Sequence, residues 1–430
     1  MKIVFSFILN SDRIGIEVKS VKKKILFILV TCFILCGCVQ KAKPISENEK
    51  LKIVVTSDIH YFLKDYYQEC EWFEESISYG DGKMVTYGDE ILNAFEKAIL
   101  EIQPDLLIVT GDLTFNGEKD GHIALANRLE KISQAGIEVA VIPGNHDIEN
   151  IFTKGYGQDD YFEVENITGE EFREIYKNCG YQIASAKHKN SLSYVIPLNS
   201  DYTLLMMDST HHKMTGGNSF NSGGKFSEST LNWMKKQLDL IKKEGKTPIV
   251  AMHHNLVDHN ELLNSGYTIA NNETVADIFK DYGVSFIFSG HIHCQNIQEI
   301  NGIYDIASSS LMDAPLQYGI VELEKNKLSY HTESLKISVD APEYFQMVSK
   351  NRMKENFEVI EDEILKQEAM DIMALVNYHY FAGTISSIKH QVLNSQGYQT
   401  IMEMEDDFIK KYMESMLKSD KNHTSLEIEF

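Results

Sequence analysis

The stretch AVIPGNHDIEN, residues 140–150, ends an apolar run in a turn that carries three polar side chains. A proline and Gly144 interrupt the run, and Asn145, His146 and Asp147 follow directly. Proline and glycine are typical of turns, so the amide, the imidazole and the carboxylate are expected where a buried strand reaches the surface. The importance of this turn depends on which side chains the neighbouring strands place at the same edge.

Apolar runs that alternate with helical patterns surround this turn. Residues 51–57, 105–111 and 137–144 have the composition of buried strands, whereas residues 89–102 and 119–135 repeat apolar side chains at helical spacing. Such alternation predicts an α/β fold whose strands form a parallel sheet covered on both faces.

The alternation resumes after an irregular insertion at residues 150–190. Strands are predicted at 247–254 and 284–293, with a helix between them. The segments 302–310 and 318–331 are also strand-like and are expected to pair with each other and close the sheet.

The periodicity changes after about residue 335. Apolar residues at helical spacing predict a C-terminal helical module over residues 336–430, with Gly383 and Gly397 at positions where helices end. This module contains no ligand motif. The domain at residues 51–335 therefore carries the side chains capable of chemistry.

A leader sequence is predicted at residues 1–38. The segment VKKKILFILVTCFILCGC (21–38) places three lysines before an apolar run that has the length of a signal-peptide core and is short for a membrane span. Its last four residues, LCGC, resemble the lipobox of bacterial lipoproteins. An uncleaved anchor helix is the alternative interpretation.

The lipobox resemblance implies that Cys38 is lipidated and becomes the mature N-terminus of an extracytoplasmic protein anchored to the cell membrane. Residues 39–50 are mostly charged or polar and are expected to form a tether between the lipid and the folded domain. Residues 1–20 precede the lysines and the apolar run of this leader, so Val21 is an alternative to Met1 as the start of translation.

The formal net charge of −22 bears on the possible partners. A strongly acidic protein repels polyanions, so a nucleic-acid-binding surface is not expected. A small anionic ligand must therefore be attracted locally, and a bound metal ion would provide that attraction.

Side chains suited to metal binding follow five of the predicted strands. They are Asp58 and His60, Asp112, the turn of Asn145, His146 and Asp147, the pair His253 and His254, and the pair His291 and His293. Because the carboxyl ends of the strands share one edge of an open α/β sheet, these groups are expected to converge. In extended chain, residues two apart point the same way, so each pair of the form D-x-H or H-x-H can reach one cluster. Glycine precedes three of the groups, where a side chain would crowd a bound ion.

The complete order D-x-H, G-D, G-N-H-D, H and G-H-x-H resembles that of the calcineurin-like metallophosphoesterase superfamily over roughly residues 51–335. The resemblance implies a four-layer β-sandwich of the α/β (α+β) class, with a dimetal site and the helical module as an addition. It assigns Asp58, His60 and His293 to one metal ion, Asn145, His253 and His291 to the other, Asp112 to both, and His146 to the substrate.

The ligand types bear on the metals and on the catalytic turn. Imidazole and oxygen ligands suit Mn²⁺ or Fe²⁺, with Zn²⁺ as an alternative, better than Ca²⁺. The neutral oxygen of Asn145 can hold an ion without cancelling the positive charge that must attract phosphate. Asp147 is expected to orient His146 and to favour its charged form. Of the adjacent histidines, the resemblance favours His253 over His254 as the ligand.

Two further residues stay open at this point. Asn116 and Glu118 lie in the segment GDLTFNGE, directly after the expected bridging residue Asp112. They can support the site or contact the substrate, or they can belong to a solvated loop.

The segments SDIHY, GDLTFNGE, PGNHDI and HHNLVDHN, with the helical module, are similar to those of bacterial class III cyclic nucleotide phosphodiesterases. This similarity implies hydrolysis of a small phosphodiester, with 3′,5′-cyclic nucleotides as the expected substrates. Metal-activated hydroxide would attack phosphorus while His146 protonates the leaving oxygen. A broad-specificity phosphomonoesterase or nucleotidase, or another phosphodiesterase of the cell surface, is the alternative. A non-catalytic binding protein is disfavoured because no ligand is missing.

The substitution Cys38→Ala removes the sulfur that would carry the lipid. The protein is then expected to leave the membrane fraction or to accumulate as an uncleaved precursor, as measured by cell fractionation and immunoblotting. Cys36→Ala keeps the lipobox pattern and serves as the matched control. A cleaved Cys38→Ala protein that still sediments with membranes would contradict lipidation at this residue.

Overall fold

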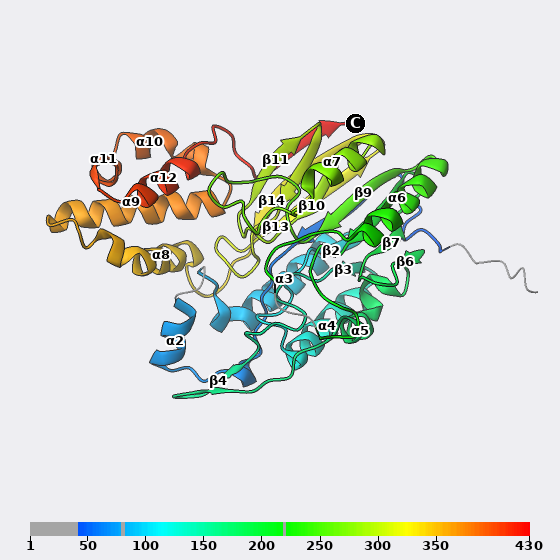
Figure 1. The fold of residues 1–430 in the computed structure, drawn as a ribbon, viewed down its shortest axis with the longest axis horizontal. Coiled ribbons are helices and arrows are strands. Elements are labelled where there is room, and N and C mark those ends of the chain that lie inside the picture. The colour runs from blue at the N-terminus through cyan, green and yellow to red at the C-terminus, as the bar shows by residue number, and fades with distance from the viewer. Residues whose placement is uncertain (1–41, 79–81, 218–220) are drawn as a thin grey trace, which may run out of the picture. The chain divides into compact units, whose positions relative to one another are not determined.

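Two mixed β-sheets form the centre of the protein (Figure 1). The computed structural model describes residues 42–78, 82–217 and 221–430. The first sheet has the strand order β15 (Ser425–Glu429), β14 (Lys327–Ser334), β13 (Gln317–Glu324), β1 (Leu51–Thr56), β2 (Leu106–Val109) and β3 (Glu138–Val141). The second has the order β11 (Asn296–Ile300), β12 (Ile303–Ala307), β10 (Phe286–Ser289), β9 (Thr247–Met252), β8 (Tyr202–Met207), β7 (Tyr194–Pro197) and β6 (Ala186–Lys187).

The expectation of one parallel sheet was wrong. β1, β2 and β3 are parallel to one another, as are β8, β9, β10 and β12, but β13 pairs antiparallel with β1 and β7 pairs antiparallel with β8.

The expected pairing of residues 302–310 with 318–331 was also wrong. β12 joins the second sheet, whereas β13 and β14 form a hairpin in the first sheet, because antiparallel neighbours need only a short connection.

The two sheets pack face to face, and helices cover their outer faces. Alternate residues of β8, such as Leu204 and Met206, belong to the core cluster that also contains the strands of the first sheet. The intervening residues Leu205 and Met207 pack with helices of a second cluster. This alternation, with period two along the strand, produces four layers. The four-layer fold predicted from the sequence is confirmed.

The helices predicted at 89–102, at 119–135 and between the strands at 247–254 and 284–293 are confirmed. They are α3 (Gly88–Ile102) and α4 (Lys119–Gln134), which belong to the core of the first sheet, and α7 (Asn272–Asp281), which covers the second together with α6 (Glu228–Lys243). The remaining elements are short: η1 (Lys64–Tyr66), α2 (Glu71–Ser78), η2 (Val85–Tyr87), β4 (Gly155–Tyr156), β5 (Tyr161–Phe162), α5 (Gly169–Ile175) and η3 (Lys177–Tyr181).

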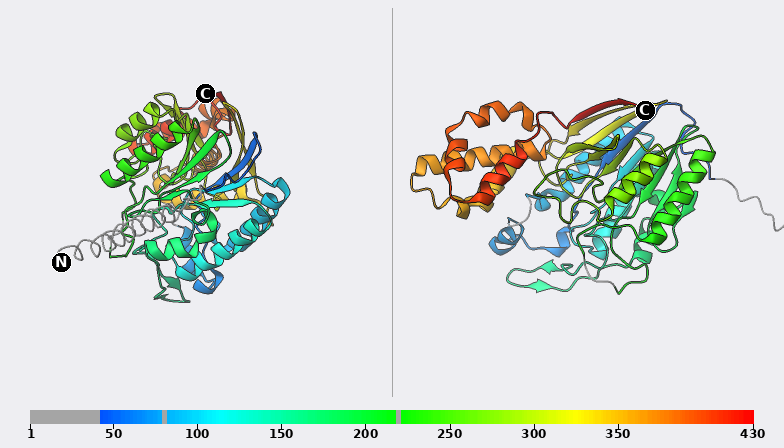
Figure 2. Two further views of the ribbon diagram at one scale, coloured as in Figure 1. Left: turned by 90° about the vertical axis from the view of Figure 1, so that its right-hand side faces the viewer. Right: turned by 45° about the horizontal axis from the view of Figure 1, so that its top comes forward.

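The C-terminal helices form a module with its own core. They are α8 (Ala341–Phe357), α9 (Glu363–Phe381), η4 (Ile385–Ser387), α10 (Lys389–Leu393), α11 (Gln396–Glu403) and α12 (Asp407–Met416). Figures 1 and 2 show these helices grouped beside the two sheets, and a separate hydrophobic cluster includes Met373, Val376, Ile401 and Met413. Aspartate caps begin α8, α9 and α12, which satisfies otherwise unpaired amide groups.

The predicted range 336–430 for the helical module needs a correction. Its last segment, β15, pairs antiparallel with β14 and extends the first sheet. Figure 2 shows the chain returning from the helices to the sheet. Its sequence SLEIE alternates polar and apolar residues, and only Leu426 and Ile428 are partly buried, as expected for an edge strand with one covered face. This strand signal was missed in the sequence because it follows directly on the helical pattern.

The two glycines of the module differ in role. Gly383 follows α9 with φ of +70°, as expected for a residue that ends a helix. Gly397 was expected to end a helix too, but it lies in the first turn of α11. A Cβ atom at this position would lie 2.3 Å from the backbone oxygen of Glu368 in α9. Gly397 therefore permits close packing of α11 on α9.

The start of the described chain is bound to the sheets rather than free. Residues 39–50 were expected to be a tether, but Ile45 and Ser46 donate backbone hydrogen bonds to the oxygens of Pro197 and Leu198. These bonds satisfy carbonyl groups at the carboxyl end of β7. The leader and Cys38 lie outside the described residues, and no helix within the described ranges is long and apolar enough to cross a membrane.

Gly397→Ala tests the close packing of α11 on α9. Because the added methyl group would press against α9, we expect the free energy of unfolding to fall by about 1–3 kcal/mol, measured by urea denaturation. Gly121→Ala in α4 is the matched control: the nearest atom to its Cβ would lie 3.6 Å away. A helical glycine with that much space gains stability from alanine, by about 0.5–1 kcal/mol. Equal effects at the two positions would contradict the close approach.

Candidate metal centre

The side chains predicted to bind metal lie together at the carboxyl ends of strands from both sheets. Asp58 and Asp112 follow β1 and β2 of the first sheet, whereas His253 and His291 follow β9 and β10 of the second. Backbone hydrogen bonds connect neighbouring turns: the amide of Asp58 donates to the oxygen of Gly111 over 3.0 Å. Loops from five strand ends thus form one site.

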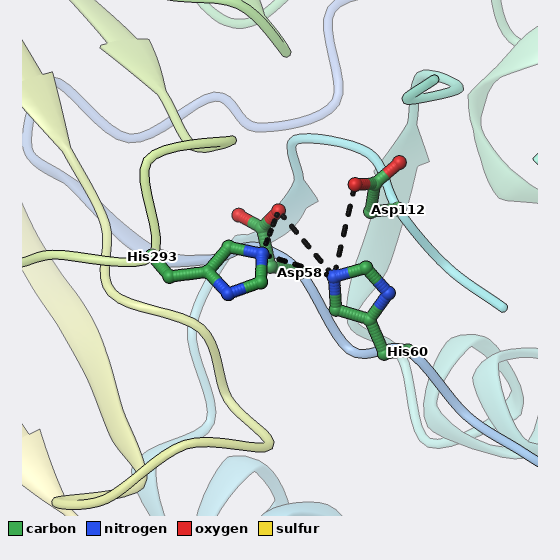
Figure 3. Close-up of side chains that lie close together, drawn as sticks. All are labelled: Asp58, His60, Asp112 and His293. Atoms are coloured by element: carbon green, nitrogen blue, oxygen red, sulfur yellow. Dashed lines mark hydrogen bonds and ion pairs between the residues drawn. The ribbon is translucent and has the colours of Figure 1, made fainter. Parts of the chain in front are cut away.

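The first group of ligands consists of Asp58, His60, Asp112 and His293 (Figure 3). All four side chains are buried. The Nε2 atoms of His60 and His293 are 3.1 Å apart, and Nε2 of His293 is 3.4 Å from Oδ1 of Asp58. Nε2 of His60 is 3.7 Å from Oδ2 of Asp112.

The second group shares Asp112 with the first. It contains His253 and His291, and Nε2 of His253 lies 3.3 Å from Oδ2 of Asp112. The side-chain oxygen of Asn145 lies 3.1 Å from the same nitrogen. The structure therefore brings all seven predicted ligands together in two groups, with Asp112 common to both.

The geometry of these groups fits metal ions. Ligand atoms around a tetrahedral ion lie about 3.4 Å apart when each bond is about 2.1 Å long, close to the separations in the first group. Oδ1 of Asp58 and Oδ2 of Asp112 are buried and have no hydrogen-bond partner among the described residues. Burial alone would raise the pKa of Asp112, but His253 and His146 hold it well below its usual value. Both carboxylates are thus available in the charged form that metals require.

Hydrogen bonds at the opposite ring nitrogens fix the orientation of the histidines. Nδ1 of His253 donates to the backbone oxygen of Thr110 over 2.8 Å, which leaves Nε2 for an ion. Nε2 of His291 donates to the oxygen of Gly266 over 3.0 Å, which leaves Nδ1. Such bonds select the tautomer of a ligand histidine.

Asp313 has the same role for His293 and was not predicted. Its Oδ2 lies 3.1 Å from Nδ1 of His293. A carboxylate in this position orients the ring and increases its basicity. Asp313 lies in an ordinary turn after β12, and no motif or spacing in the sequence marks it.

The structure distinguishes His253 from His254 as predicted. Both ring nitrogens of His254 face partners other than an ion: Nδ1 is 2.8 Å from Oγ of Ser209, and Nε2 is 2.9 Å from the oxygen of Ser222. Burial, the largest cause, together with nearby histidines, holds the pKa of His254 well below its usual value. His254 is therefore a neutral structural residue beside the site.

The backbone at the ligands is not extended, so the expected strand geometry for the D-x-H and H-x-H pairs was wrong. Five ligands have left-handed φ angles, namely Asp58 (51°), His60 (43°), Asp112 (47°), His291 (68°) and His293 (58°). Such angles are uncommon for residues other than glycine and concentrate at functional sites. The ligands lie in tight turns beyond the strands, and His291 and His293 consequently reach different groups.

The turn at residues 144–147 is held against Asp112. Oδ1 of Asp112 accepts a hydrogen bond of 2.8 Å from the backbone amide of His146. A Cβ atom on Gly144 would lie 2.2 Å from that same Oδ1, so only glycine permits this approach. The sequence correctly predicted that glycine is required before the ligand.

The ring of His146 is oriented by residues that the sequence left open. Its Nδ1 donates to the backbone oxygen of Phe115 over 2.8 Å and to Oδ1 of Asn116 over 3.0 Å. The ring lies edge-on to that of His60, with centroids 4.9 Å apart, and is partly exposed. Asn116 therefore supports the site and does not belong to a solvated loop.

Asp147 does not orient His146 as predicted. Its Oδ1 accepts hydrogen bonds from the amides of Leu113 and Thr114, and its Oδ2 accepts one from the amide of Gly144. Both oxygens are thus occupied by backbone groups. Burial, followed by the charge of Asp112, raises the pKa of Asp147 to about 7. Asp147 instead holds the turns after β2 and β3 together.

Glu118 also has a structural position. Its Oε2 accepts a hydrogen bond of 2.9 Å from the backbone amide of Asn116, and its side chain is fully buried. Burial raises the pKa of Glu118 to about 8. Glu118 therefore shapes the loop that presents Asn116 to His146.

The arrangement matches a known family. Residues 51–295, more than half of the chain, match the family described as calcineurin-like phosphoesterase. The chain belongs to the calcineurin-like phosphoesterase family. Residues 338–423 match a second family, described as the C-terminal domain of cyclic nucleotide phosphodiesterase, and this match covers the helices α8–α12.

Individual relatives of this calcineurin-like chain are distant. A probable cyclic nucleotide phosphodiesterase of Rhodococcus erythropolis is 26% identical over 211 residues, which cover 48% of this chain and 58% of that protein. A probable glycerophosphodiester phosphodiesterase of Arcobacter nitrofigilis is 28% identical over 222 residues, which cover 49% of this chain and 67% of that protein. A dimetal phosphatase from Danio rerio has a similar structure, with a TM-score of 0.49 and 10% identity over 68% of this chain and 97% of that chain. The match to the Rhodococcus protein spans less than two thirds of its length.

The family and the two groups of ligands support a metal-dependent phosphoester hydrolase. The fold is that of a metallophosphoesterase, and the aspartate and histidine side chains described above form its two metal-binding groups.

Asp112→Asn tests the shared ligand. The amide removes the negative charge that faces both groups, so each chain is expected to hold fewer metal ions than the wild type, measured by mass spectrometry of the purified protein. Hydrolysis of bis(p-nitrophenyl) phosphate should fall by several orders of magnitude. His254→Asn is the control, since His254 contacts no ligand oxygen and a folded variant should keep its metal. If Asp112→Asn holds as much metal as the wild type, Asp112 is not a metal ligand.

Proposed function

We propose that this protein is a phosphodiesterase that hydrolyses 3′,5′-cyclic nucleotides. The observation that carries the proposal is the pair of ligand groups sharing Asp112, with the partly exposed ring of His146 beside them. The match of the helical module to the C-terminal domain of cyclic nucleotide phosphodiesterase supports the choice of substrate, as does the name of the Rhodococcus relative.

The residues of the chain create the conditions for this reaction. When bound, two divalent ions (Mn²⁺ or Fe²⁺, or alternatively Zn²⁺) supply activated water and offset the negative charge that develops at phosphorus. Asn145 offers a neutral oxygen. The second group therefore carries less negative charge than it would with a carboxylate at this position in addition to Asp112. A locally positive site then attracts phosphate to a chain whose net charge is −22.

His146 is positioned to donate a proton to the leaving oxygen. Because Nδ1 donates to the backbone oxygen of Phe115, Nδ1 carries a proton and the remaining nitrogen, Nε2, can face the substrate. Burial, the largest cause, lowers the pKa of His146, and the charge of Asp112 opposes this effect. The ring must be doubly protonated to act as the acid, and the negative charge of a bound phosphodiester would favour that state.

A glycerophosphodiester is a second candidate substrate. The Arcobacter relative is named a probable glycerophosphodiester phosphodiesterase, and its identity to this chain is similar to that of the Rhodococcus relative. The metal-binding groups act on the phosphodiester itself and do not distinguish the two substrates. Selectivity must come from residues around them.

We also infer a cellular location from the leader. The lipobox at residues 35–38 supports lipidation at Cys38 and attachment to the outer face of the cell membrane. The substrate would then be a small phosphodiester or nucleotide outside the cytoplasm, and no nucleic acid partner is expected.

His146→Ala tests the acid. A nucleoside alkoxide is a poor leaving group, so the variant is expected to lose about 10²–10⁴-fold in kcat on adenosine 3′,5′-cyclic phosphate. The loss on bis(p-nitrophenyl) phosphate should be much smaller, because p-nitrophenolate leaves without a proton. Metal content should stay at the wild-type level.

Two results would contradict this role. Equal losses on both substrates with normal metal content would mean that His146 only positions the phosphate. Equal losses with reduced metal content would make it a ligand or a structural residue. If the wild type hydrolyses phosphomonoesters but no diester, the proposed function itself is wrong.

A further inference from the structure

A cavity of about 340 Å³ connects the metal centre with the helical module. Its lining includes the ligands His291 and His293 and residues of α8, α9 and α12. Its volume lies in the range of small-molecule sites, which is about 300–1,000 Å³. No residue of the proposed reaction explains why the helices should enclose such a space.

Five tyrosine and phenylalanine rings line this cavity. They are Tyr267, Phe345, Phe381, Phe408 and Tyr412. The ring of Tyr267 is 5.2 Å from that of His291, whereas Phe408 and Tyr412 lie on α12, with centroids 6.0 Å apart and planes within 6° of parallel. Aromatic side chains of the lining thus lie both beside a metal ligand and on α12.

Hydrogen bonds hold part of this surface in place. The hydroxyl of Tyr412 donates to Oδ1 of Asn377 over 3.0 Å, and the amide nitrogen of Asn377 donates to Oγ of Ser349 over 2.7 Å. These contacts connect α12, α9 and α8. The ring of Tyr412 is therefore fixed before a ligand enters, which lowers the entropy cost of binding.

The charge of the walls indicates what kind of group fits. The described residues that line the cavity include Arg352 but no carboxylate, although the chain has a net charge of −22. A cationic head group would be repelled by Arg352 and by the ions of the adjacent centre. A flat, uncharged ring would instead pack between the aromatic side chains.

We propose that this cavity binds the heterocyclic base of the substrate, and that α12 determines selectivity for nucleotides. The inference rests on the proposed function, since the phosphodiester must lie at the metal centre. In a 3′,5′-cyclic nucleotide one ribose separates the phosphorus from the base, so a base site must begin next to the metal ligands. The cavity meets this requirement, because His291 and His293 are part of its lining.

Phe408 is the residue best suited to a test. Its side chain is 61% exposed, so truncation removes a stacking surface without opening the core. Ile364, on α9, is 72% exposed and does not line the cavity. Phe408→Ala and Ile364→Ala are therefore a matched pair of exposed apolar truncations in the helical module.

The experiment compares two diesters that differ only in the base: adenosine 3′,5′-cyclic phosphate and 1-O-methylribose 3′,5′-cyclic phosphate. The wild type and Ile364→Ala are expected to prefer the nucleotide by about 10–100-fold in kcat/KM, the range given by stacking of one base on aromatic rings. Phe408→Ala should lose about tenfold of this preference through KM. Its rate on the diester without a base should stay unchanged.

Other outcomes overturn the assignment. A loss of the same size on both diesters in Phe408→Ala would show a general structural role. An unchanged preference would place the base elsewhere. Glycerophosphocholine hydrolysed in preference to the cyclic nucleotide, with sensitivity to Phe408→Ala, would show that the rings enclose a cation.

Binding without hydrolysis separates this inference from the proposed function. Saturation-transfer NMR with the full chain and no added metal is expected to detect adenosine but not ribose, and the adenosine signal should weaken in Phe408→Ala. If adenosine binds in this way but no diester is hydrolysed, the proposed function fails and the base site stands. If diesters are hydrolysed but adenosine does not bind, the base site is wrong.

Discussion

The carboxylate of Asp112 faces imidazoles from both β-sheets, and the site is arranged around this contact. Its Oδ2 lies 3.7 Å from Nε2 of His60 and 3.3 Å from Nε2 of His253. Its Oδ1 accepts a hydrogen bond from the backbone amide of His146. A buried charge is costly unless it is paired. The amide of His146 provides a partner on one side, and metal ions held by the two groups would provide the pairing on the other. The relative position of the two sheets is therefore coupled to metal binding.

The backbone at the site has a cost that the surrounding structure must offset. Five ligands adopt left-handed φ angles, and each such residue other than glycine costs about 1–3 kcal/mol. Buried carboxylates hold these turns by accepting amide hydrogen bonds, as Asp147 does from Leu113, Thr114 and Gly144. Bound ions would add to this stabilisation because they bind only the folded arrangement.

Much of the fold and of the site could be predicted from the sequence, and the failures have a common cause. Strands such as β1 and β2 are buried on both faces, so their apolar runs mark them clearly, and their ligands follow at fixed places. Asp313 and Asn116 act through contacts between segments distant in sequence, which no local pattern encodes. The role of Asp147 was misjudged because its adjacency to His146 in sequence suggested a contact that the turn does not make.

The return of β15 to the first sheet makes the helical module an insertion whose two ends are attached to neighbouring strands. Its helices cannot diffuse away from the metal centre after a single cleavage of the chain between α8 and α12, because both fragments would stay hydrogen-bonded through β14 and β15. The same topology orders events during synthesis. The second sheet is complete once residue 307 has emerged, whereas the first must wait for residue 425 and beyond to gain its edge strand. The half of the site that contains Asp58 and Asp112 thus belongs to the part of the protein that is finished last.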